Sequence, residues 1–369
     1  MELEPLADTD PRRAGPFHLR GRLRLTRVGR VYLARSDDGL FAEVTVVNPQ
    51  LAWEPHVLRH LTEGITAAQR LRVPHVQRLR GADLTARAPW FAGDALPGPT
   101  LRDAVQRHGP LPPPAVRHLA VALAGALEEV HAAGPVHRAL DPAAVVLTPD
   151  GPVLTGLGVA RALEDTSVTL PRLLPDAVAY LAPEVVRGYE PGAPADVFGL
   201  GAVVTYAATG RGPFGTGDSG DVARRVRDDD PDLAYLPGDL VEAVRACVRA
   251  QPGERPTAAA LRRRLAAGTP GAWHLPTGLT AEQSRWATLG RGRTVPSAPA
   301  LAPAPTERIP GEPAAAPGPP ARPASIPPAP EDPHPGSDRR ASRGLTAALM
   351  VLAGLAVAGL TFAAVTLLR

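Results

Sequence analysis

Residues 136–147 read VHRALDPAAVVL, a stretch in which a few polar residues stand among apolar ones. The segment before it predicts a helix, because leucines recur at helical spacing over 119–127, after three prolines and before a glycine. The polar residues of the stretch itself are His137, Arg138 and Asp141. A loop of this kind after a long helix is a candidate functional site.

The composition excludes several classes of protein. The chain has 369 residues, of which 44% are apolar and 4% aromatic, and its formal charge is only +3, so a nucleic-acid partner is not expected. Every basic residue is an arginine, and a mechanism that needs a lysine is therefore closed to this chain. The single cysteine, Cys247, excludes an internal disulfide and is expected to be a buried apolar residue.

The folded region is expected over residues 17–285, as an α+β protein of two lobes. Strand patterns at 17–23, 29–35 and 41–47, with an SDDG turn between the last two, predict a small β-rich lobe over about 17–92. Helical patterns dominate from about residue 111 and predict a larger lobe over about 95–268.

The C-terminal part predicts a tether and a membrane anchor. Residues 292–338 are rich in proline and alanine, which favours an extended, disordered linker. Residues 345–368 carry no charge, and at about 1.5 Å per residue a helix of roughly 36 Å crosses a hydrocarbon layer of about 30 Å. Arginines just before the span place the N-terminal bulk in the cytoplasm, so we expect a single-pass protein of the cell membrane in contact with lipid.

The order of motifs resembles the bacterial Ser/Thr protein kinases of the eukaryotic type. No single motif carries the resemblance; it rests on the order in which seven motifs follow one another over about 250 residues. The motifs are GRVYLAR, WFAGDALPGPTLRDAV, VHRALDPAAVVL, LTGLGVAR, YLAPE, ADVFGLGAVVTYAATGRGPFG and CVRAQPGERPTAAAL. The resemblance implies a two-lobed fold around a nucleotide cleft.

The resemblance also assigns structural roles to residues of the larger lobe. Glu184 is expected to pair with Arg255, and Asp196 to accept hydrogen bonds from backbone amides of the loop that holds His137 and Arg138. All five residues match the family pattern.

The chemical positions of the small lobe depart from the pattern. Arg24 and Thr26 stand at the first two glycines of the family's phosphate loop, and only Gly29 is kept. Thr45 stands where the family has its catalytic lysine. Glu43 stands where the family has an alanine that packs on adenine, and a carboxylate buried there needs a partner or a proton.

Further departures lie where the family binds metal and substrate. Gly64, with Glu63 as the other possible alignment, stands at the glutamate that pairs with the lysine. Ala139 replaces the catalytic aspartate, while Ala144 and Gly156 replace both metal ligands, so no metal site is expected. In addition, Asp141 stands at the loop's usual lysine, and Ala177 at a threonine that positions the peptide.

The sequence therefore favours a membrane-tethered pseudokinase without cofactor, acting as a signalling scaffold or regulator. Its expected partner is a protein, such as an active Ser/Thr kinase or a cell-envelope regulator, and a homodimer is possible. One alternative is a weak or atypical kinase that uses ATP and Mg²⁺. Another is a metal-independent module that binds a nucleotide or anion through Arg20, Arg22, Arg24 and Arg27.

Overall fold

The computed structural model describes residues 3–160, 175–267 and 273–290. The chain divides into two units, Met1–Pro303 and Ala304–Arg369, and the described residues all lie in the first. The predicted linker at 292–338 and the predicted membrane span at 345–368 fall outside the described residues. Within the described ranges, no helix is long and apolar enough to cross a membrane.

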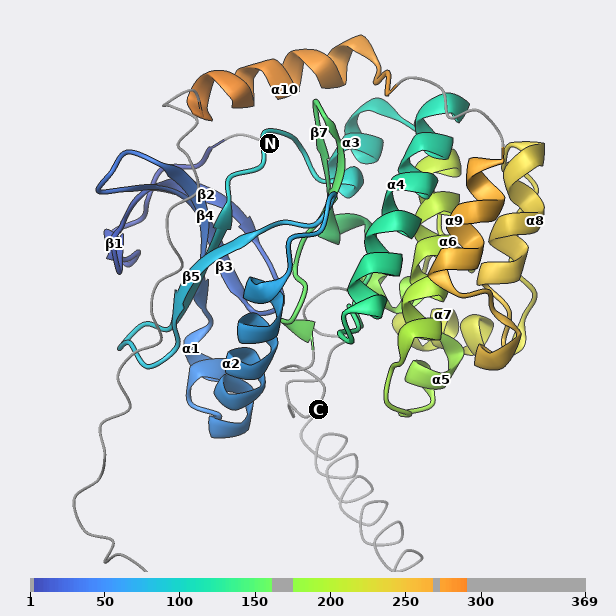
Figure 1. The fold of residues 1–369 in the computed structure, drawn as a ribbon, viewed down its shortest axis with the longest axis horizontal. Coiled ribbons are helices and arrows are strands. Elements are labelled where there is room, and N and C mark those ends of the chain that lie inside the picture. The colour runs from blue at the N-terminus through green and yellow to red at the C-terminus, as the bar shows by residue number, and fades with distance from the viewer. Residues whose placement is uncertain (1–2, 161–174, 268–272, 291–369) are drawn as a thin grey trace, which may run out of the picture. The chain divides into compact units, whose positions relative to one another are not determined.

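The small lobe is built on a six-stranded antiparallel sheet with the order β1-β2-β3-β4-β6-β5 (Figure 1). Its strands are β1 (Arg13–Ala14), β2 (Phe17–Leu25), β3 (Gly29–Ser36), β4 (Phe41–Val47), β5 (Leu79–Asp83) and β6 (Trp90–Asp94). The three strands expected from alternation, and the SDDG turn, are confirmed. Order begins before the expected start at residue 17, because β1 pairs with β2 and Glu4 forms a bridge with Arg22.

Two helices complete this lobe, α1 (Pro49–Ala52) and α2 (Pro55–Arg70). Both begin at a proline, which costs nothing at a helix start because its missing N–H would have no partner there. Val57, Leu61 and Ile65 recur every four residues on α2 and are buried against Leu79 of β5. This apolar stripe fixes which face of α2 packs against the sheet.

The large lobe is mainly helical. Its helices are α3 (Leu101–His108), α4 (Pro113–Ala132), α5 (Pro183–Val186), α6 (Ala193–Thr209), α7 (Ser219–Asp228), α8 (Gly238–Cys247) and α9 (Ala258–Ala266). It also contains the 3-10 helices η1 (Pro142–Ala144), η4 (Pro175–Tyr180) and η5 (Pro252–Glu254), and a hairpin of β7 (Val145–Thr148) and β8 (Gly151–Leu154).

The core of this lobe lies between α4 and α6. Leu119, Leu123 and Leu127 of α4 are completely buried, as the leucine periodicity predicted. Helix α6 is buried on nearly all sides and ends at Gly210, whose left-handed backbone (φ +78°) suits a glycine. Cys247 at the end of α8 is also buried, and burial raises the pKa of its thiol to about 12. It is the inert apolar residue expected.

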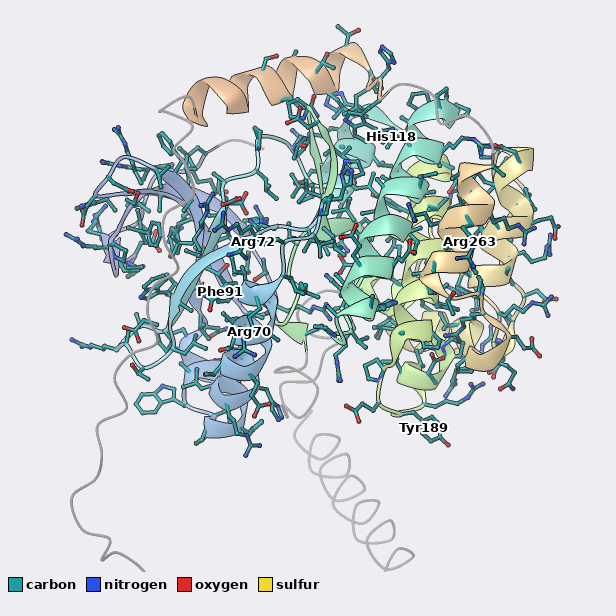
Figure 2. All side chains as sticks on the ribbon, viewed as in Figure 1. Arg70, Arg72, Phe91, His118, Tyr189 and Arg263 are labelled. Carbon is teal, nitrogen blue, oxygen red and sulfur yellow. The ribbon has the colours of Figure 1, made fainter. Side chains whose placement is uncertain are left out.

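A last helix, α10 (Thr277–Gly290), lies along the β7–β8 hairpin and α3 (Figure 1). Leu279 is completely buried, and Gln283 Nε2 donates to Leu147 O at 2.8 Å. Just before the helix, Trp273 Nε1 donates to Thr148 O at 2.9 Å and its ring packs on His118, which Figure 2 labels beneath α10. Two hydrogen bonds and one apolar contact therefore fasten this segment to the hairpin.

Candidate functional site

A cavity of about 140 Å³ opens between the two lobes. Its roof comes from the β2–β3 turn and from β4, and its floor from the loop after α4 and from residues 155–160. Phe91 of β6, labelled in Figure 2, lines its inner side. Seven residues singled out from the sequence for replaced chemistry line it: Arg24, Thr26, Glu43, Thr45, Ala139, Asp141 and Ala144. Gly156 is an eighth.

Two of the replaced positions in the roof bind each other. Arg24 of β2 reaches across β3, and its terminal nitrogen lies 2.5 Å from Glu43 Oε2 of β4. Only 6% of the Glu43 side chain and 16% of the Arg24 side chain are exposed. The buried Glu43 carboxylate therefore has the partner it needs. The attraction between the two opposite charges offsets the hydration that each loses on burial.

The same carboxylate joins the segment that links the lobes. Gln77 Nε2 donates to Asp94 O at 2.8 Å and lies 3.4 Å from Glu43 Oε2. The Leu96 amide lies 3.4 Å from Glu43 Oε1. Gln77 fits here because residue 93 is a glycine, where a Cβ would lie 2.8 Å from the Gln77 side chain. Gln77 and Glu43 thus link the cavity to the backbone at 94–96.

The turn above the cavity is closed on itself. Thr26 N donates to Gly29 O at 2.9 Å, and Thr26 Oγ1 donates to the same oxygen at 2.8 Å. Val28 at the tip is buried in the core of the small lobe. Gly29 is needed for packing, since a Cβ would lie 2.0 Å from Val46 O. The turn offers a hydroxyl-closed hairpin in place of a cradle of free amides.

Helix α2 approaches the floor through a contact between two glycines. A Cβ on Gly64 would lie 1.8 Å from Gly158 O, and a Cβ on Gly158 would lie 2.2 Å from Gly64 O. Glu63 is exposed. Gly64 is therefore the α2 residue that faces the residues after β8, and no side chain fits at its position. Thr45 of β4 is buried and lines the cavity without a lysine in reach.

The loop at 137–144 uses its one carboxylate for structure. Asp141 Oδ1 accepts hydrogen bonds from the amides of Ala143 (2.7 Å) and Ala144 (3.0 Å), and so caps η1. Ala139 and Ala144 line the cavity with methyl groups. The carboxylate at 141 is thus committed to backbone amides, which leaves it poorly placed to accept a proton from a substrate.

His137 lies completely buried beside the cavity. Its Nε2 lies 2.9 Å from Thr155 O and donates to it, while Nδ1 has no hydrogen-bond partner among the described residues. Burial lowers the pKa of His137, so the ring is neutral at pH 7. Gly156, next to Thr155, is exposed and has a left-handed backbone (φ +83°), which a side chain would strain.

The acidic residues that line the cavity are Glu43 and Asp141, within the described residues. One is paired with an arginine and the other caps a helix. The described residues also hold no cluster of three or more His, Cys, Asp or Glu side chains placed to bind a metal. The site as built does not fit a magnesium–nucleotide complex, which needs carboxylate or amide oxygens beside the phosphates.

The structural residues expected from the sequence hold the floor together. Asp196 of α6 accepts hydrogen bonds from the amides of His137 (2.7 Å) and Arg138 (2.7 Å), and His131 Nε2 lies 2.8 Å from it. Arg138 has φ +72°, a strained conformation that these contacts stabilise, and its guanidinium pairs with Glu190 at 3.1 Å. These contacts hold the loop at 137–144 in place from its backbone.

The Glu184–Arg255 pair is present and bidentate, with N–O distances of 2.6 and 2.7 Å. The Arg255 side chain is fully buried, lies over the ring of Phe198 and also donates to three backbone carbonyls. Ala177, expected at a peptide-positioning place, is buried in η4. These contacts tie α5, α6 and η5 into one body.

The arginines proposed to attract an anion do not act together. Arg22 binds Asp10 and Arg24 binds Glu43, so both are already neutralised. Arg20 is exposed on β2 and does not line the cavity. Of these four, Arg27 also lines the cavity, and no carboxylate among the described residues pairs with it. Sequence reasoning missed Gln77, Leu96 and Asp10, since no motif marks them.

The chain matches known protein kinases along most of its described length. The protein kinase domain family matches residues 27–264. The probable serine/threonine-protein kinase PkwA of Thermomonospora curvata is 40% identical over 71% of this chain, and the serine/threonine-protein kinase AfsK of Streptomyces coelicolor 34% identical over 73%. The chain spans about a third of each relative, 35% in both cases.

A solved structure shares the fold. The kinase domain of Mycobacterium tuberculosis PknI superimposes with a TM-score of 0.56 at 22% identity, over 71% of this chain and 98% of that one. The two lobes, with a curled sheet in the first and helices in the second, are the arrangement expected from the sequence.

Proposed function

This chain belongs to the protein kinase family, and we propose that it is a pseudokinase that keeps the kinase shape as a regulatory or scaffolding surface. The observation that carries the proposal is the Arg24–Glu43–Gln77 network in the cavity roof. All three side chains line the cavity and bind one another there, so a nucleotide would have to displace an ion pair.

Three further observations support the same reading. Thr45 brings no cation to the cleft, and Ala144 and Gly156 bring no metal ligand. The contact between Gly64 and Gly158 leaves no room at position 64 for the glutamate that the resemblance expects there. Phosphoryl transfer depends almost entirely on positioning and on charge stabilisation. In an active kinase the side chains at these positions would supply both. The Glu184–Arg255 and Asp196 contacts, which only hold the fold, are intact.

A second candidate function is an active Ser/Thr protein kinase of atypical mechanism. It is favoured by the relatives at 34–40% identity, which carry the name of serine/threonine-protein kinases. In that case Arg27 would contact phosphate and Asp141 would have to leave the amides of η1.

Calorimetric titration with ATP, with and without MgCl₂, separates the two functions. The pseudokinase predicts no magnesium-dependent binding tighter than about 100 µM, and no transfer of label from γ-labelled ATP to protein substrates. Tight magnesium-dependent binding followed by transfer contradicts it. The double variant Arg24→Gly with Glu43→Ala is the matched control, because it clears the roof without adding a metal ligand. It should gain metal-independent ADP binding and still transfer no phosphate.

We further propose that residues 345–368 anchor the chain in the cell membrane with the kinase-like domain in the cytoplasm, in contact with an active kinase, an envelope regulator or a second copy of itself. The uncharged span of 24 residues supports the anchor. Fractionation of the host tests it, since full-length protein should sediment with membranes and resist carbonate extraction. A variant ending at residue 338 should be soluble. Crosslinking and pull-down from those membranes then identify the partner.

A further inference from the structure

A second cavity, of about 150 Å³, lies in the large lobe and shares no lining residue with the cleft. It is formed by α3, η4, the end of α6 and the loop at 210–217. Arg102 and Arg211 line it together with Tyr180 and Tyr206, and no carboxylate lines it among the described residues. The described walls of the cavity therefore carry positive charge and no carboxylate.

Arg102 shows the imbalance most clearly. One of its terminal guanidinium nitrogens is buried and has no hydrogen-bond partner among the described residues. Its backbone is held in place, because the Tyr206 hydroxyl donates to Arg102 O at 3.3 Å. A buried N–H of a charged group that lacks an acceptor destabilises the protein, since its hydration is lost and nothing replaces it.

The remaining walls suit a small acceptor group. The loop contains glycines at 210, 215 and 217 with positive φ, which keeps it close to α6 without side chains in the way. Arg225 of α7 fixes it by donating to Phe214 O and Thr216 O, both at 2.8 Å. The rings of Tyr180 and Tyr206 meet edge to face at 6.1 Å and form the back wall.

We propose that this cavity binds an anionic oxygen group, a phosphate monoester or a carboxylate, through Arg102 and Arg211. Guanidinium groups bind such groups in bidentate geometry, and Arg102 already holds a donor for which the described residues supply no acceptor. The proposal is independent of whether the cleft binds nucleotide.

The test is a thermal-unfolding and calorimetric titration of the full-length chain with sodium phosphate and with sodium acetate, each against sodium chloride at equal ionic strength. Phosphate or acetate should raise the melting temperature of the wild type. Arg102→Met should weaken that response at least about tenfold, the effect of losing one charge-assisted hydrogen bond. It should also raise the melting temperature in chloride alone, because it removes a buried guanidinium nitrogen that has no acceptor among the described residues. A purely structural arginine would do the opposite.

Arg211→Gln is the second variant, since Arg211 is exposed and its loss leaves the fold intact. It should weaken the response by a smaller factor. Arg107→Gln, an exposed position on the same helix, should leave the response unchanged. A response to phosphate alone assigns the site to phosphate esters, and an equal response to acetate assigns it to carboxylates. The proposal is overturned if neither anion differs from chloride, or if Arg102→Met and Arg211→Gln both respond as the wild type does.

Discussion

Removing one partner of the Arg24–Glu43 pair should destabilise the protein far more than removing both. Glu43→Ala leaves a guanidinium that is 16% exposed without its carboxylate, and Arg24→Met leaves a carboxylate that is 6% exposed without its cation. Breaking a buried pair from one side costs about 3–5 kcal/mol. Because Arg24 keeps some contact with water, we expect about 2 kcal/mol for Glu43→Ala, and about 3 kcal/mol for Arg24→Met.

The double variant should lie within about 1 kcal/mol of the wild type, because apolar residues that replace both charges remove the desolvation cost as well. The two single changes sum to about 5 kcal/mol. The coupling energy from the cycle is then at least about 4 kcal/mol, above the usual range of about 0.5–3 kcal/mol for residues in contact. Urea unfolding of the four full-length proteins, followed by far-UV circular dichroism, measures it. A coupling energy below about 0.5 kcal/mol is typical of an exposed pair and would refute the reasoning that this pair replaces a ligand.

Four further outcomes are expected. Glu184→Ala should lower the free energy of unfolding by about 3–5 kcal/mol, measured by urea unfolding, because it leaves a fully buried arginine without its carboxylate. Gly64→Glu should abolish soluble expression, since its Cβ meets a carbonyl oxygen at 1.8 Å, whereas Glu63→Ala on the exposed face should express as the wild type does. The hydrogen bond from Arg22 lowers the pKa of Asp10 to about 2, so this carboxylate stabilises the fold above about pH 4 and stops doing so as the pH falls to about 2. The free energy of unfolding, measured with urea, should therefore fall by about 1–2 kcal/mol less in Asp10→Asn than in the wild type over that pH range. The thiol of Cys247 should resist Ellman's reagent at pH 8 in the native protein and react fully in urea, and rapid labelling of the native state would contradict its burial.

The leucine face of α4 follows from periodicity, since the pattern reports which side of the helix meets the core. Strands 17–23, 29–35 and 41–47 follow from their content of Val, Leu, Tyr and Phe, because such residues favour strands even where, as in β3 and β4, both faces are largely buried. The Glu184–Arg255 contact was also predictable, because the motif that contains each residue fixes its place in the family's fold.

The network in the cleft could not be predicted in the same way. Arg24 and Glu43 lie on strands that are not neighbours, and β2 has a register shift between Arg22 and Arg24 that local alternation does not reveal. The sequence showed that Glu43 needed a partner, and only the register of three strands shows which arginine provides it. Gln77 was missed because a lone glutamine becomes informative only beside Gly93.

The attachment of α10 bears on how this protein should be cut for study. The family match stops at residue 264, yet Trp273, Leu279 and Gln283 reach back to cover the β7–β8 hairpin. A recombinant fragment that ends where the family match ends would expose the carbonyls of Leu147 and Thr148 and the apolar surface beside them, and we expect it to aggregate. Fragments meant for crystals or for screening should therefore run through residue 290.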